Sequence, residues 1–190
     1  PTLTDHWSKL SLDSDAKVLV PLCGKSLDMH WLKQLGHTVV GIELVEKAIT
    51  QFFDDASALA LQESKQTGTK YSAENIHLYH ADFFKVQPDE MPVEAWYDRA
   101  ALVALPSTMR QAYVEQLLNL TTKDSKGLMV TFDYPQEEMQ GPPFALPDSE
   151  VESLFSQHFT VERVQWTDVL EQEQRDLTRC SLSVLVLNRR

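Results

Sequence analysis

The first quarter of the chain has a hydrophobic pattern that predicts a strand, a helix and a second strand. Residues 17–22 form a short apolar run rich in valine, as in a strand buried on both faces of a parallel sheet. Ser26 is a candidate N-cap for the helix, and Gly36 lies where that helix should stop. The apolar residues of the helix fall on one face: Leu27, Trp31, Leu32 and Leu35. A second strand is predicted over 38–44, so the segment is typical of a right-handed βαβ unit, which binds ligands beyond the carboxyl ends of its strands.

The rest of the chain continues with helices and strands. Helical spacing of apolar residues predicts helices over 46–62, 106–120 and 148–157. Strand patterns occur over 76–80, 95–101, 127–132, 158–166 and 181–187. The connection between the last two strands is too short for a crossover helix, so we expect them to pair antiparallel at one edge of the sheet. The sequence therefore predicts an α/β fold, with a mostly parallel sheet in a single domain over residues 1–190.

Gly24 and Glu43 give the βαβ unit a chemical interpretation. Gly24 lies in the first strand-to-helix turn, where a missing side chain lets a ligand approach the backbone. Glu43 ends the second strand, roughly 20 residues further on, where a carboxylate accepts both hydroxyls of a ribose. A pyrophosphate cofactor needs several loop glycines, and this loop has one, so a nucleoside without phosphate, such as S-adenosylmethionine, is favoured. The alternative is that Gly24 is only a turn glycine and Glu43 a solvated strand end.

Other polar residues end the next two strands. Asp82 follows one of them, so its carboxylate should point over the same edge as Glu43, with Phe83 beside it either stacking on a base or packing in the core. Asp98 and Arg99 end the following strand, and an arginine there can hold a ligand carboxylate with two hydrogen bonds. An ordinary surface ion pair is the alternative.

Metal and thiol chemistry are not favoured. His77 and His80 lie three residues apart on a predicted strand, so their side chains point to opposite faces and we expect no metal. Cys23 has no nearby base, and we interpret it as a small turn residue rather than a nucleophile.

The composition narrows the partners. A net charge of −11 argues against nucleic acid, because such binding depends on lysine and arginine. No window approaches the roughly 20 apolar residues that span a bilayer, and two cysteines are too few for a disulfide framework. We expect a monomer in the cytoplasm that acts on a small molecule, with no nucleic-acid or membrane partner.

Three motifs in order, VPLCGKSLDMHWL with GHTVVGIEL, then YDRAALVAL, then GPPFALPDSEVESLF, resemble the thiopurine S-methyltransferase family, in particular its bacterial members. The resemblance implies a Rossmann-like class I methyltransferase fold, with a mostly parallel seven-stranded sheet and an antiparallel C-terminal edge. It also implies methyl transfer from S-adenosylmethionine to the sulfur of aromatic and heterocyclic thiols, leaving S-adenosylhomocysteine.

The resemblance also implies roles for individual residues. It places Leu22, Gly24, Glu43, Asp82, Phe83 and Arg99 at the cofactor; Asp98 and Arg99 at the catalytic centre; and Arg99, Phe144 and Arg179 at the substrate. Arg175 is a second candidate for the substrate-side arginine. Family members carry an N-terminal segment, rich in tryptophan, that covers both ligands, and this chain begins just after it, so we expect an incomplete lid.

Other functions fit the same motifs. A related methyltransferase would act on small thiols, halide, or selenium or tellurium species. A non-catalytic nucleoside-binding protein would bind the cofactor without turnover. A nicotinamide oxidoreductase is disfavoured by the single loop glycine.

Overall fold

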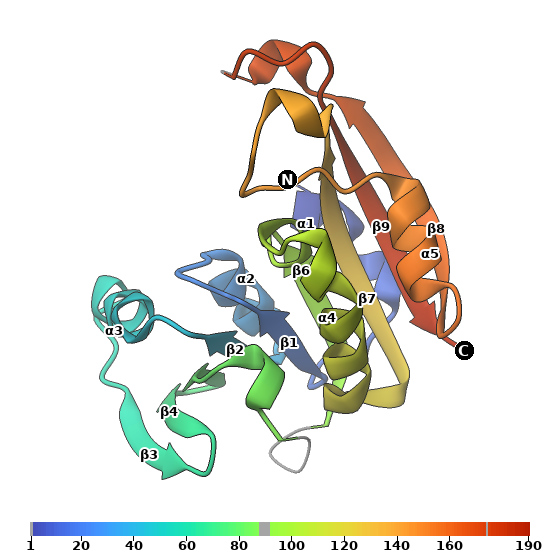
Figure 1. Ribbon diagram of the computed structural model, residues 1–190. Helices are drawn as coiled ribbons and strands as arrows, with labels where there is room; N and C mark the ends of the chain where they lie inside the picture. The colour runs from blue at the N-terminus through green and yellow to red at the C-terminus, as the bar shows by residue number, and fades with distance from the viewer. Residues whose placement is uncertain (1, 88–91, 174) are drawn as a thin grey trace. The chain divides into compact units, whose positions relative to one another are not determined.

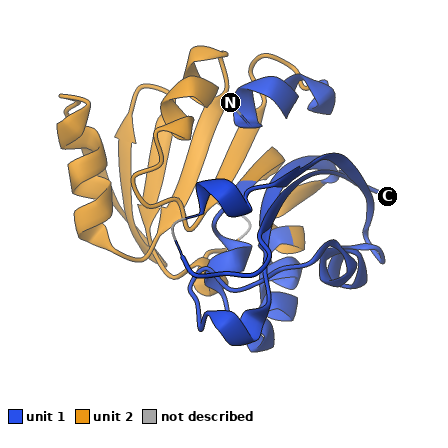
Figure 2. Ribbon diagram, turned by 90° about the horizontal axis from the view of Figure 1, so that it is seen from above, with its two compact units in different colours: residues 1–11, 98–117, 123–190 blue, residues 12–97, 118–122 orange. Residues whose placement is uncertain are grey.

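The computed structural model describes residues 2–87, 92–173 and 175–190 (Figure 1). Its contacts divide the chain into two compact units (Figure 2). Unit 1 comprises Pro1–Ser11, Asp98–Leu117 and Lys123–Arg190, and unit 2 comprises Leu12–Tyr97 and Leu118–Thr122. The single domain expected over 1–190 stays a prediction.

The elements have the following bounds. The α-helices are α1 (Thr2–His6), α2 (Asp28–Gln34), α3 (Glu46–Asp55), α4 (Ser107–Leu120) and α5 (Asp148–Phe155). The strands are β1 (Lys17–Pro21), β2 (Thr38–Glu43), β3 (Leu61–Lys65), β4 (Gly68–Ala73), β5 (Ile76–His80), β6 (Val93–Arg99), β7 (Thr121–Asp133), β8 (Phe159–Asp168) and β9 (Ser181–Arg189). Short 3-10 helices are η1 (Trp7–Leu10), η2 (Phe83–Lys85), η4 (Leu102–Ala104), η5 (Gln136–Glu138) and η6 (Leu170–Gln172).

Unit 2 contains the predicted βαβ unit. Its strands lie in the order β3-β4-β5-β2-β1-β6, and β2 pairs in parallel with both β1 and β5. The register of β1 and β2 runs from Lys17↔Thr38 to Pro21↔Ile42, and four of the five β1 residues are buried. The helices α2 and α3 pack on β2. The parallel pairing confirms the prediction made from the two apolar runs.

The end of α3 was predicted wrongly. The helix stops at Asp55 rather than at residue 62, because the backbone turns at Ser57, whose φ is +52°. Leu59 and Leu61 are 92% and 75% exposed, so the apolar spacing that extended the predicted helix does not mark a buried face. The chain continues instead into the antiparallel β3–β4 hairpin, which raises the strands among the described residues to nine, against the seven implied by the resemblance.

The start and face of α2 also differ from the prediction. Leu27, not Ser26, is the N-cap residue, and the cap has no side-chain hydrogen bond. Leu27 and Leu35 are 75% and 42% exposed, while Met29 and Leu32 are buried. The buried stripe is therefore narrower than the predicted one.

Unit 1 contains an antiparallel sheet in the order β7-β9-β8, with α5 packed on β8 (Figure 1). The pairing of β8 with β9 confirms the predicted C-terminal hairpin. On α4, Tyr113 and Leu117 are buried as predicted, but Met109 is 38% exposed. No helix in the described part of the chain has the length and hydropathy needed to cross a bilayer.

Candidate functional site

Glu43 organises the loops at the carboxyl ends of β1 and β2 in unit 2. Its Oε2 accepts a hydrogen bond from the backbone N–H of Gly24 at 2.9 Å, and its Oε1 accepts one from Val45 at 2.8 Å. A carboxylate offers about four acceptor positions, so each oxygen retains capacity for a second donor. The carboxylate can therefore accept two ligand hydroxyls while it holds the loop.

The loop after β1 leaves open space beside Gly24. A Cβ built at Gly24 would meet no atom within 4 Å, and the φ of this residue is +51°. Leu22 also has a positive φ, +47°, which is an uncommon conformation for a residue with a side chain. The structure thus joins Gly24 to Glu43, with Leu22 in the same loop, and the roles of these residues at a cofactor stay predictions.

Cys23 packs inward from the same loop. A Cβ at Gly41 of β2 would lie 2.7 Å from the Cys23 sulfur and 2.5 Å from a methyl group of Leu78, so a side chain is excluded there. Burial, and then the nearby Glu43 carboxylate, raise the pKa of the Cys23 thiol. The thiol is therefore neutral and fills space, in agreement with its interpretation as a turn residue.

Asp82 follows β5 at the same edge of the unit 2 sheet as Glu43. The backbone N–H of Ala81 donates to the carbonyl of Glu43 at 3.0 Å, which joins the two strand ends. One Asp82 oxygen accepts from the N–H of Phe84 at 3.1 Å, and the other lies 3.2 Å from the Lys85 ammonium. Phe83 is 4% exposed and its ring meets that of Phe84 edge-on, so most of its surface serves packing.

Asp98 belongs to unit 1 and is 1% exposed. Its oxygens accept hydrogen bonds from the N–H of Ala101 at 3.0 Å, the N–H of Leu102 at 3.3 Å and the Tyr113 hydroxyl at 2.8 Å. Burial raises the pKa of Asp98 to about 6, although these three donors act in the opposite direction. Burial and the Asp98 carboxylate raise the pKa of Tyr113 in turn. The predicted catalytic role of Asp98 stays a prediction, and its burial favours an indirect one.

Arg99 is exposed and lies between Asp98 and a strained residue. Ala100 has a φ of +75°, a conformation that disfavours any side chain. The buried Asp98 carboxylate accepts hydrogen bonds from the N–H groups of Ala101 and Leu102. These bonds close the turn that carries Arg99.

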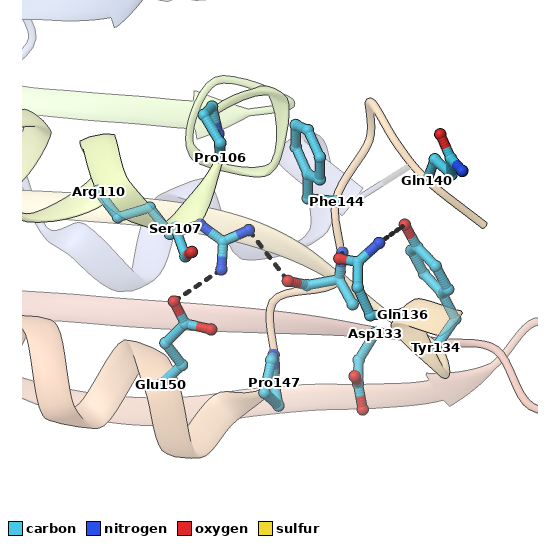
Figure 3. A pocket seen from close by; sticks show the side chains of 11 residues that line it. Pro106, Ser107, Arg110, Asp133, Tyr134, Gln136, Gln140, Phe144, Pro147 and Glu150 are labelled. Carbon is cyan, nitrogen blue, oxygen red and sulfur yellow. Dashed lines mark hydrogen bonds and ion pairs between the residues drawn. The ribbon is translucent and has the colours of Figure 1, made fainter. Parts of the chain in front are cut away.

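A cavity of about 630 Å³ lies within unit 1 (Figure 3). Its lining residues come from α4, the end of β7, the following loop and α5: Pro106, Ser107, Arg110, Asp133, Tyr134, Gln136, Gln140, Phe144, Ala145, Pro147 and Glu150. Phe144, which the family resemblance places at the substrate, lines this cavity. A Cβ at Gly141 would lie 2.6 Å from the Phe144 ring, so glycine is required where the loop passes this side chain.

The two candidate arginines of the tail lie near the end of β7. Arg179 forms a 2.5 Å ion pair with Asp133, which lines the cavity. The Arg175 guanidinium lies 5.5 Å from the centre of the Phe132 ring and pairs with Glu173. The geometry therefore connects Arg179 with the cavity more directly than Arg175.

Sequence reasoning missed Arg110. This residue is 2% exposed, and its guanidinium donates to Glu150 at 2.7 Å and to the carbonyl of Ala145 at 3.0 Å (Figure 3). Its Nε also donates to the carbonyl of Leu105 at 3.2 Å. A lone arginine on an amphipathic helix has no sequence signal for burial, because its acceptors lie up to 40 residues away. The sequence found Tyr113 only as an inward-facing residue and did not predict its bond with Asp98.

The chain is similar to known methyltransferases. A family model described as Thiopurine S-methyltransferase matches residues 1–190. The Thiopurine S-methyltransferase of Xanthomonas campestris pv. campestris (strain 8004) is 43% identical over 176 residues, which cover 92% of this chain and 81% of that protein. That of Xanthomonas axonopodis pv. citri (strain 306) is 40% identical over 195 residues, covering 100% and 89%.

A solved structure supports the fold. The crystal structure of Burkholderia thailandensis 1,6-didemethyltoxoflavin-N1-methyltransferase, with bound 1,6-didemethyltoxoflavin and S-adenosylhomocysteine, aligns with a TM-score of 0.67 at 15% identity. The alignment covers 100% of this chain and 76% of that one. The predicted α/β, Rossmann-like class I methyltransferase fold is confirmed, with β3 and β4 in addition.

Proposed function

The chain belongs to the thiopurine S-methyltransferase family, and we propose that it transfers a methyl group from S-adenosylmethionine to the sulfur of thiopurines or other aromatic and heterocyclic thiols. The observation that carries the proposal is the Glu43 carboxylate, which bonds the N–H groups of Gly24 and Val45 and retains acceptor capacity beside an open glycine.

The residues around Glu43 fit a nucleoside. Two carboxylate oxygens match the two hydroxyls of a ribose, and the open space at Gly24 admits the rest of the ligand close to the backbone. In this proposal Leu22 contacts the same ligand, Asp82 accepts from the base amino group, and Phe83 offers the part of its ring that is not packed. The loop has one glycine and no cradle for pyrophosphate, which supports the choice of a sulfonium nucleoside.

The proposed methyl transfer depends more on the alignment of the two ligands than on a general acid or base. Bound S-adenosylmethionine supplies an electrophilic methyl group on a positively charged sulfur. The acceptor sulfur would attack as a thiolate, in line with the sulfonium S–CH3 bond that breaks, and S-adenosylhomocysteine would leave. Charge would be dispersed in the transition state, so exclusion of water would favour the reaction. Aromatic thiols ionise readily, and the protein's main contribution is to hold the two ligands in line.

Four residues of unit 1 also have proposed roles at the ligands. The exposed Arg99 would hold a ligand carboxylate or stabilise the thiolate. Phe144 would contact the flat face of the heterocycle from the wall of the unit 1 cavity. Arg179, which pairs with Asp133, would bind the substrate. Asp98 would act by holding the Arg99 turn, because its carboxylate is buried.

We also propose a cytoplasmic monomer that acts on small molecules and not on nucleic acid. The two cysteines, Cys23 and Cys180, are both buried and free, which is usual in a reducing compartment. The excess of acidic over basic residues, 28 against 17, disfavours binding to phosphate backbones.

The test is methyl transfer from S-adenosylmethionine to 6-mercaptopurine, followed by mass spectrometry, with the 6-oxo purine as control. Product with the thiol alone supports the proposal. Binding of S-adenosylhomocysteine without product from aromatic thiols, small thiols, halide, selenite or tellurite would indicate a nucleoside-binding protein instead. Product from an inorganic acceptor alone would support S-adenosylmethionine as the cofactor and refute the proposal that thiols are the acceptors.

A further inference from the structure

The segment 100–105 of unit 1 connects two residues that the proposed function uses, and it is fastened at both ends from α4. At its start, Asp98 bonds the N–H groups of Ala101 and Leu102, and the Tyr113 hydroxyl donates to Asp98 at 2.8 Å. At its end, the Arg110 side chain donates to the carbonyl of Leu105 at 3.2 Å. The segment therefore depends on two buried polar side chains that lie one turn apart on the same helix.

The same segment anchors the loop that carries Phe144. The backbone N–H of Phe144 donates to the carbonyl of Val103 at 2.6 Å. Arg110 reinforces this connection through its hydrogen bond to the carbonyl of Ala145 at 3.0 Å. Any displacement of the segment would consequently move the Phe144 backbone as well as the turn at Arg99.

We propose that Tyr113 is a positioning residue for both Arg99 and Phe144. Its hydroxyl holds the Asp98 carboxylate against the backbone of 101 and 102, and this bond fixes the turn that presents Arg99 and the segment that anchors Phe144. The inference rests on the proposed function for the roles of these two residues.

The hydroxyl, rather than the bulk of Tyr113, carries the effect. The ring is fully buried on α4 and would fill the same space in phenylalanine. The hydroxyl donates to Asp98 at 2.8 Å, a shorter distance than those from the N–H groups of Ala101 and Leu102. The residue just beyond Arg99 has an unfavourable backbone conformation, with φ +75° at Ala100. A strained turn relaxes when its restraint is removed, so loss of one oxygen atom should alter ligand binding.

The experiment compares Tyr113→Phe with wild type and with Val114→Ala. Val114 is the next residue on α4, 1% exposed, and its truncation removes packing while it leaves the Tyr113 hydroxyl in place. We expect Tyr113→Phe to raise the Kd for S-adenosylhomocysteine and the KM for 6-mercaptopurine about three- to tenfold, the net contribution of one typical hydrogen bond. The kcat at saturation should change by less than about threefold.

Amide hydrogen exchange gives a readout independent of activity. The N–H groups of Ala101 and Leu102 donate to Asp98, so they should exchange faster in Tyr113→Phe than in Val114→Ala at equal global stability. Unchanged exchange at these amides, or an equal rise of Kd and KM in Val114→Ala, would overturn the inference. If the wild type binds S-adenosylhomocysteine but methylates no thiol, only the proposed acceptor is overturned. The Kd for S-adenosylhomocysteine and the exchange of the two amides still decide the role of Tyr113. Wild type that does not bind S-adenosylhomocysteine would overturn both proposals.

Discussion

Asp98→Asn tests whether the carboxylate that organises the Arg99 turn is destabilised by its burial. The pKa of Asp98 is raised from 3.8 to about 6, chiefly by burial. Asparagine retains an oxygen for the N–H groups of Ala101 and Leu102, and its amide can donate to the Tyr113 oxygen, which accepts as well as donates. The substitution therefore removes the charge and preserves the shape and most of the hydrogen bonds.

The raised pKa of Asp98 determines how its contribution to stability changes with pH. Between pH 4 and pH 6 the unfolded chain has already lost this proton while the folded chain keeps it, so the contribution of Asp98 to stability falls as the pH rises through this range. The interval from 3.8 to about 6 corresponds to about 3 kcal/mol. Asparagine has no such dependence. We expect wild type and variant to differ by less than about 1 kcal/mol at pH 4, and the variant to be more stable by up to about 3 kcal/mol at pH 8.

The assay is urea unfolding followed by tryptophan fluorescence, which the four tryptophans make practical at low protein concentration. The quantity of interest is the difference in unfolding free energy between variant and wild type at each pH, because the other titrating groups cancel in it. A difference that stays constant from pH 4 to pH 8 would refute the reasoning. It would mean that the three donors, not burial, determine the ionisation of Asp98.

Three further changes test the site and its support. Glu43→Ala should weaken binding of S-adenosylhomocysteine by about 30-fold or more in calorimetry, because two charge-assisted hydrogen bonds are lost; unchanged affinity with a large loss of turnover would contradict the assignment. Arg110→Met should lower the free energy of unfolding by about 3–5 kcal/mol, because Glu150 and two carbonyls lose a buried partner; a loss below about 1 kcal/mol would show that water replaces the guanidinium. Gly41→Ala should lower stability by about 1–3 kcal/mol and weaken cofactor binding, because the new methyl group overlaps Cys23 and Leu78; a thermal midpoint and a Kd equal to those of wild type would refute this close packing.

The strands and helices with strong periodicity could be predicted from the sequence, and so could the ends of β2 and β5. The apolar run of β2 and the alternating pattern of β5 both indicated strands, and the two strands pair in parallel, so Glu43 and Asp82 lie at the same carboxyl edge. The C-terminal hairpin followed from the short connection between its strands.

The hydrophobic pattern of the sequence did not predict the β3–β4 hairpin. The residues Leu61–Lys65 are mostly exposed and do not alternate, and this strand is specified by backbone pairing with β4 rather than by side-chain burial. The mistaken end of α3 has the same origin, since the spacing of Leu59 resembles that of a buried residue although the chain has already turned.

By itself the sequence determined the βαβ unit, the family and the residues at the strand ends, because each depends on local periodicity or on a short motif. Only the tertiary structure decided what those residues contact. It buried Asp98 beside Tyr113, enclosed Arg110 among acceptors from three segments, and placed Phe144 on the wall of a cavity. The reason is physical: burial, desolvation and hydrogen-bond satisfaction depend on groups that are distant along the chain, and their distances are set when the elements pack.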